Sequence, residues 1–148
     1  MGALIIPESS ITLKNIALNE IRIAFIDVLK KMGGKIRVKK TKPVSGEDVG
    51  DIYVSYSLLN AIDIKASLSP YLIDEYPILS IAASQAKGVT VMRGLSELRH
   101  KESDRIKSII TNLSKVGFKA VSKKDNISIN GSNNIKITNQ KKIKTYGD

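Results

Sequence analysis

The sequence has no cysteine, no tryptophan and a single histidine, His100. Without cysteine there is no disulfide, no thiolate metal site and no cysteine nucleophile. One histidine argues against a histidine metal site or a histidine-centred catalytic triad, and we assign His100 no role. Aromatic residues make up only 5% of the chain, so we expect any ligand site to rely on charge rather than on stacking.

Long apolar runs are also missing, since no stretch approaches the ~18 uninterrupted apolar residues of a membrane-spanning helix. The first residues lack the basic-then-apolar pattern of a signal peptide. We therefore expect a soluble, cytoplasmic protein without a membrane segment. The 148 residues, 42% of them hydrophobic, suffice for one domain of ordinary size or for two small lobes that share a core.

The chain is strongly basic, with a formal net charge of +10. This excess raises the question of nucleic-acid binding. However, the lysines are scattered along the chain, and the sequence predicts no basic sheet surface rich in aromatic residues. We therefore expect no nucleic-acid partner, whereas small anions remain candidate ligands.

Two segments of the chain align without gaps, LKKMGGKIRVKK (29–40) and LSKVGFKAVSKK (113–124). Each segment follows apolar residues at helical spacing. These residues are Ile21, Phe25, Val28, Leu29 and Met32 in the first copy, and Ile106, Ile109, Ile110, Leu113 and Val116 in the second. Gly33 and Gly117 stand where a helix end needs a left-handed residue.

Short strands are predicted around both helices. The predicted strands cover 10–16, 35–38, 51–56, 61–66, 88–94, 118–121, 126–131 and 134–139. A further helix is predicted over 74–88, with Asp74 near its N-cap, Pro77 in its first turn and Gly88 at its end.

This order of elements predicts an α/β fold of repeated strand-helix-strand-strand units, with helices inside and short mixed sheets outside. We expect a single domain over 1–148, with an internal repeat over approximately 10–55 and 89–130. A doubly wound nucleotide-binding fold is disfavoured, because no G-x-G-x-x-G turn opens a helix.

The stretch GLSELRHKESDRIKSI (94–109) concentrates charge before an apolar helix. A helix that begins between positions 98 and 102 places Lys101, Arg105 and Ser108 on one face, with Arg99 in the preceding loop. Together with the unpaired backbone N–H groups, these cations form an anion site. Alternatively, Glu102 and Asp104 supply the counter-charge and the face is merely solvated.

Two acidic residues, Asp74 and Glu75, have a similar ambiguity. An aspartate at an N-cap is commonly structural. It can also be a carboxylate, held ionised by the helix terminus, that accepts a proton from a substrate hydroxyl.

The run IDEYPILSIAASQAKGVTVMRGLSELRHKESDRI (73–106) closely resembles the EPSP synthase (3-phosphoshikimate 1-carboxyvinyltransferase) family. The resemblance is carried by E-L-R-x-K-E-S-D-R, preceded by I-D-E-x-P and A-x-G-x-T, and it extends over essentially the whole chain. It implies the inside-out α/β barrel of enolpyruvyl transferases, here as an incomplete second lobe. It also implies transfer of the enolpyruvyl group of phosphoenolpyruvate to the 5-hydroxyl of shikimate 3-phosphate, in the shikimate pathway of aromatic amino-acid biosynthesis. The reaction uses no cofactor or metal and is blocked by glyphosate.

The resemblance also implies residue roles. Asp74 matches the residue that contacts the hydroxyls of shikimate 3-phosphate and is a candidate base. Lys101 matches a substrate contact and proton shuttle, and Glu102 matches the group placed for proton transfer at the methylene carbon of phosphoenolpyruvate. Arg105 matches the partner of the phosphoenolpyruvate carboxylate, and Asp148 matches the aspartate of T-Y-[GN]-D-H-R-M.

The match covers only part of the family's two-lobed enzyme, and the chain stops just before the His-Arg pair of that last motif. We therefore expect an enzyme part that is active only with a complementary fragment. The alternative is a truncated, catalytically inactive remnant or anion-binding module of the same fold. In either case the chain should expose apolar helix faces, and we expect self-association or a marginally folded monomer.

Overall fold

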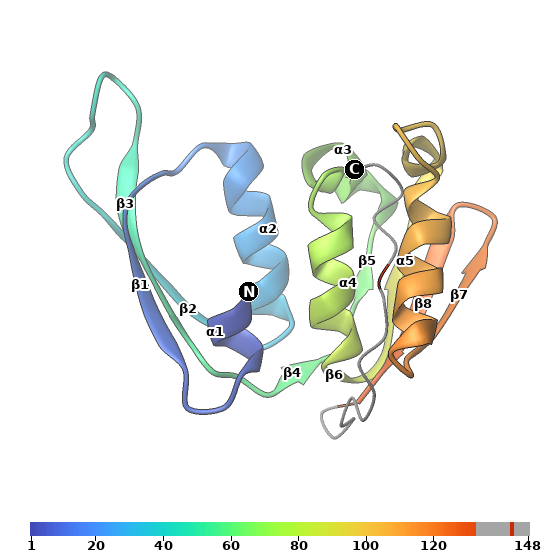
Figure 1. Cartoon of the computed structure of the whole chain (residues 1–148). Helices are drawn as coiled ribbons and strands as arrows, with labels where there is room; N and C mark the ends of the chain where they lie inside the picture. Colours follow the sequence, from blue (N-terminus) through green and yellow to red (C-terminus); the bar gives the residue numbers. More distant parts are fainter. Residues whose placement is uncertain (133–142, 144–148) are drawn as a thin grey trace.

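The structure, a computed structural model, describes residues 1–132 and 143, and of residues 20–22 the backbone alone. The elements in chain order are α1 (Gly2–Ile5), β1 (Ser10–Ala17), α2 (Glu20–Lys31), β2 (Lys35–Lys40), β3 (Val49–Ser55), β4 (Leu59–Asn60), β5 (Asp63–Ile64), η1 (Ala66–Leu68), α3 (Ser69–Leu72), α4 (Tyr76–Ser84), β6 (Ala86–Met92), η2 (Ser96–Arg99), α5 (Arg105–Lys115), β7 (Lys119–Lys123) and β8 (Asn126–Gly131). Figure 1 shows the longer helices α2, α4 and α5 between two sheets.

The first sheet is antiparallel and has the strand order β1-β3-β2. Its register pairs Val54 with both Ile11 and Ile36, so these apolar side chains share one face of the sheet. Ile36 and Val54 pack against the core from that face. The opposite face therefore points away from the helices.

The second sheet has the order β4-β6-β8-β7, with β5 also paired to β6. The short strands β4 and β5 run parallel to β6, whereas the pairs β6-β8 and β7-β8 are antiparallel. The three longer strands follow the same first-third-second order as the strands of the first sheet. The predicted fold class, α/β with helices inside and mixed sheets outside, is confirmed, and the described residues form no closed barrel.

One hydrophobic core contains residues from both halves of the chain. Its fully buried members include Leu4 and Met32 from the N-terminal half and Leu79, Ile106 and Ile127 from the C-terminal half. The apolar helix faces expected from the spacing are largely buried here, although for position 21 only the backbone is described. Gly33 and Gly117 have the expected left-handed conformation, with φ of 94° and 93°.

A buried tyrosine lies at the start of α4. Tyr76 is 0% exposed, and its hydroxyl has no hydrogen-bond partner among the described residues. Burial raises the pKa of Tyr76. The nearby Ser69 hydroxyl lowers this pKa by a smaller amount, although the two hydroxyls do not have the geometry of a hydrogen bond. An unpartnered polar group at this depth costs stability.

Two predicted helices have other boundaries in the structure. The helix expected over 74–88 spans only Tyr76–Ser84, because Ala86 already pairs with Leu59 in the second sheet. Its N-cap is Glu75, so Asp74 lies one residue outside the helix, while Pro77 is in the first turn as expected.

The helix expected to begin between 98 and 102 begins at Arg105. Leu98 is fully buried within the short helix η2, and the Asp104 side chain caps α5 by accepting from the Lys107 backbone N–H at 3.0 Å. The strand predicted over 134–139 lies outside the described residues.

Candidate active site

Four of the predicted site residues come together at one end of α4 and α5. Asp74 precedes α4, Lys101 and Glu102 lie in the loop between η2 and α5, and Arg105 opens α5. Arg105 Nη1 is 3.0 Å from Asp74 Oδ1, and Arg105 Nη2 is 3.1 Å from Glu102 Oε2. Lys101 Nζ is 3.6 Å from Asp74 Oδ1. We call these four residues the charged cluster.

The charged cluster contains two cations and two carboxylates. Its carboxylates are open to solvent, with Asp74 and Glu102 each 68% exposed, whereas the Arg105 side chain is only 20% exposed. Ion pairs of this exposure contribute about 0.2–1 kcal/mol each, so a ligand carboxylate or phosphate can displace them at low cost. The arrangement therefore holds two cations near each other while leaving their partners replaceable.

Lys101 reaches the charged cluster from the loop between η2 and α5, and not from α5 itself. Because α5 begins at Arg105, the expected helical face shared by Lys101, Arg105 and Ser108 does not form. The Ser108 hydroxyl instead donates to the Asp104 carbonyl at 3.0 Å, within the first turn. The prediction that these residues are neighbours is thus confirmed for Lys101 and Arg105, but the geometric reason for it was wrong.

The described contacts of Arg99 lie outside the charged cluster. Its guanidinium donates to the Lys124 carbonyl at 2.7 Å and pairs with Asp104 at 3.4 Å and Asp125 at 3.7 Å. His100 is exposed. The remaining predicted site residue, Asp148, lies outside the described residues.

An apolar groove extends from the charged cluster along α4 and α5, which lie side by side in Figure 1. It has a volume of about 980 Å³. It is lined by Ile5, Asp74, Pro77, Ser80, Ile81, Ser84, Gln85, Arg105, Ser108, Ile109, Asn112, Leu113, Val116, Phe118 and Ile143. Asp74 and Arg105 thus belong both to the groove and to the charged cluster.

The groove was not predicted from the sequence, although α4 carries a signal for it. Leu79 and Ala82 are fully buried on one side of the helix, whereas Ile78 and Ile81 are each 40% exposed on the other. A helix that is apolar all round normally has partners on every side. The segment PILSIAA therefore indicates a second contact surface that the described residues leave open.

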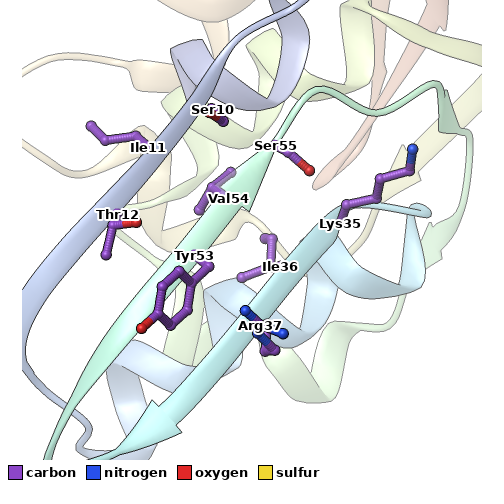
Figure 2. A pocket seen from close by; sticks show the side chains of 9 residues that line it. All are labelled: Ser10, Ile11, Thr12, Lys35, Ile36, Arg37, Tyr53, Val54 and Ser55. Carbon is purple, nitrogen blue, oxygen red and sulfur yellow. The ribbon is translucent and has the colours of Figure 1, made fainter.

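A second depression, of about 630 Å³, lies on the first sheet and is shown in Figure 2. The register places Thr12, Tyr53 and Arg37 on the face that points away from the core. The Arg37 guanidinium lies 4.8 Å from the centre of the Tyr53 ring. This depression shares no residue with the charged cluster, and its polar face is that of a solvated sheet.

A bidentate ion pair lies where β5 meets β6. Arg93 Nε and Nη2 donate to Asp63 Oδ1 and Oδ2 at 2.8 Å and 2.6 Å. The hydrogen bonds from Arg93 hold the pKa of Asp63 below its usual value, and Asp63 in turn raises the pKa of Arg93. This pair fixes the strand end from which the loop toward the charged cluster departs.

Within the described ranges, no group of three histidine, cysteine or carboxylate side chains is arranged to hold a metal ion. None of the described helices is both long and apolar enough to cross a bilayer.

The arrangement of sheets and helices matches that of solved EPSP synthase structures. One structure from Acinetobacter baumannii superposes with a TM-score of 0.83 at 37% identity, covering 88% of this chain and 29% of that one. A second structure from the same organism gives a TM-score of 0.80 at 34% identity. The α/β fold is therefore that of a portion of the solved EPSP synthases.

Sequence comparison narrows this class to one family. The family model for EPSP synthase (3-phosphoshikimate 1-carboxyvinyltransferase) matches residues 1–148, so the chain belongs to the EPSP synthase family. It is 44% identical over 135 residues to the enzyme of that name from Carboxydothermus hydrogenoformans, covering 91% of this chain and 32% of the relative. It is 40% identical over 148 residues to that of Petrotoga mobilis, covering 34% of the relative. The chain thus spans about a third of the length of these curated relatives.

Proposed function

We propose that this chain supplies part of the active site for enolpyruvyl transfer from phosphoenolpyruvate to the 5-hydroxyl of shikimate 3-phosphate. The observation that carries the proposal is the charged cluster, in which Asp74, Lys101, Glu102 and Arg105 converge from two separate segments. Both substrates are polyanions, and the cluster offers two cations whose present partners are exposed carboxylates. The reaction needs proton transfers as well as anion binding, and Asp74 and Glu102 are the groups that can perform them.

The chemistry assigns a separate task to each group. The 5-hydroxyl oxygen bonds to C2 of phosphoenolpyruvate as its proton passes to a base, for which Asp74 is our candidate. The methylene carbon C3 gains a proton from Glu102 to give a tetrahedral intermediate. The phosphate group then leaves with the proton held by Asp74, and the new methyl group returns a proton to Glu102, which yields the enolpyruvyl product.

The two cations neutralise the substrates. The planar guanidinium of Arg105 suits the carboxylate of phosphoenolpyruvate, which it can bind through two nitrogens. Lys101 is a point charge next to Asp74, suited to contact shikimate 3-phosphate and to move a proton to or from Asp74. No metal or organic cofactor takes part in this scheme.

The remaining part of the enzyme is expected from a complementary piece of the fold. The chain covers about a third of its relatives, and its apolar groove begins at the charged cluster. We infer that an amphipathic helix of the complementary piece occupies the groove and brings the missing substrate contacts to the cluster. Burial of Ile81 and the other exposed groove residues would drive this association.

The test is reconstitution. The chain is mixed with the complementary part of a family enzyme, and phosphate release from phosphoenolpyruvate is measured with shikimate 3-phosphate present. We expect turnover that Lys101→Ala abolishes and Lys107→Ala retains, because Lys107 is an exposed lysine of α5 outside the charged cluster. A folded mixture without turnover would contradict the proposal.

The second candidate function, an inactive anion-binding module, follows from the partial coverage of the family. Calorimetric titration of the chain alone with shikimate 3-phosphate distinguishes the two. Binding that Lys101→Ala abolishes, together with an inactive reconstituted mixture, would favour the module.

A further inference from the structure

Arg99 lies at the end of η2, two residues before Lys101 and three before Glu102. It is half-buried, with 34% of its side chain exposed. Its guanidinium reaches three acceptors in different directions, the Asp104 carboxylate, the Lys124 carbonyl and the Asp125 carboxylate. Asp104 follows the loop that carries the two cluster residues, whereas Lys124 and Asp125 lie between β7 and β8.

The contact with Asp104 closes this loop. Asp104 Oδ2 pairs with Arg99 at 3.4 Å, while its Oδ1 accepts from the Lys107 backbone N–H at 3.0 Å as the cap of α5. One carboxylate therefore fixes the end of the loop both to the helix and to the residue at which the loop begins. Residues 100–103 span the interval between these two fixed points.

The contact with Lys124 ties the same loop to the turn between β7 and β8. Arg99 Nη2 donates to the Lys124 carbonyl at 2.7 Å. Two further bonds join the loop base to this turn, since the Leu95 N–H donates to the Asp125 carbonyl at 2.7 Å and the Gly94 N–H to Asn126 Oδ1 at 3.2 Å. The β7-β8 turn is thus a support against which the loop is held.

We propose that Arg99 is a positioning residue, which holds residues 100–103 so that Lys101 and Glu102 stand against Asp74 and Arg105. The inference rests on the proposed function for its catalytic consequence. Arg99 acts through the loop, because its described charge partners are Asp104 and Asp125 rather than members of the charged cluster. The three acceptors face three different nitrogens of the guanidinium, Nη1, Nη2 and Nε, and the single nitrogen of a lysine cannot take all three places.

The first test uses the chain alone and needs no substrate. In Arg99→Lys we expect exchange of the hydrogen-bonded amides of His100 and Lys107, which flank the loop, to rise about ten-fold, while β8 and the melting temperature stay unchanged. We also expect the Arg105 Nε–H NMR signal to shift. Arg37→Lys is the matched control, because Arg37 lies on the other sheet over Tyr53. Faster exchange that spreads through β7 and β8, or an unmoved Arg105 signal, would overturn the positioning role.

The second test uses the reconstituted enzyme. A misplacement of catalytic groups by about 1 Å costs about 100-fold in rate, so we expect kcat to fall 10- to 100-fold in Arg99→Lys. KM for phosphoenolpyruvate should change far less, because Arg105 is intact. An unchanged kcat would refute the role of Arg99. If the wild-type chain gives no turnover but the exchange and NMR results are as expected, the proposed function is wrong, whereas the role of Arg99 in positioning residues 100–103 is retained.

Discussion

Replacement of Arg105 by lysine separates a ligand-binding role from a merely structural one. Arg105 donates from two nitrogens, Nη1 to Asp74 at 3.0 Å and Nη2 to Glu102 at 3.1 Å, and a lysine nitrogen cannot occupy both places. The two carboxylates are 68% exposed, so the lost pair costs less than about 1 kcal/mol of unfolding free energy. A two-point contact with a ligand carboxylate is stronger, and loss of one charge-assisted bond there costs about 1.5–3 kcal/mol.

The expected result for Arg105→Lys is therefore an almost unchanged stability with an affinity for phosphoenolpyruvate that falls about 10- to 150-fold. Urea denaturation measures the first quantity, and calorimetric titration of the reconstituted protein measures the second. Arg37→Lys serves as the control, since it makes the same chemical change away from the cluster. A stability loss above about 2 kcal/mol with unchanged affinity would refute the reasoning and make Arg105 a structural residue.

Three further predictions concern the fold. Tyr76→Phe removes an unpartnered buried hydroxyl, so urea denaturation at neutral pH should show that the free energy of unfolding rises by about 1 kcal/mol, and a fall would contradict this. Because the pKa of Tyr76 is raised in the folded state, the wild type should also lose stability relative to Tyr76→Phe as the pH rises from the ordinary tyrosine pKa toward the raised one. Ile81→Lys should reduce self-association in sedimentation experiments, whereas Val121→Lys, at an exposed position outside the groove, should not. Arg93 lowers the pKa of Asp63, so the wild type should be more stable than Asp63→Asn at neutral pH. This difference in unfolding free energy should vanish as the pH falls through the folded-state pKa of Asp63, and a difference that persists in strong acid would argue against the role of the ion pair.

Local patterns in the sequence were sufficient to predict most elements of the fold. Apolar residues at helical spacing predicted α2 and α5, and Gly33 and Gly117 marked their ends through a conformation that other residues rarely adopt. The differences fell at helix boundaries, which depend on distant contacts, and in short helices such as α1 and α3, which the sequence analysis did not predict. No local signal told that Ala86 would pair with Leu59 and so end α4 early.

The site was predictable to a similar degree. The resemblance to the family named Asp74, Lys101, Glu102 and Arg105, and these residues do meet. Two of the three contacts of Arg99 could not be predicted from its neighbours in sequence, because Lys124 and Asp125 lie 25 and 26 positions further along the chain. The groove was missed for the same reason, since it exists only once α4 and α5 lie side by side.

The groove and the charged cluster share two residues, so covering the groove affects the strength of an ion pair in the cluster. Asp74 and Arg105 line one end of the groove, so a helix that fills it displaces water from the surroundings of both charges. Two unit charges about 4 Å apart interact by about 1 kcal/mol in water but by about 4 kcal/mol at the effective dielectric constant near a protein surface. The ion pair between Asp74 and Arg105 would therefore be stronger once the groove is covered than it is while the groove is open to water.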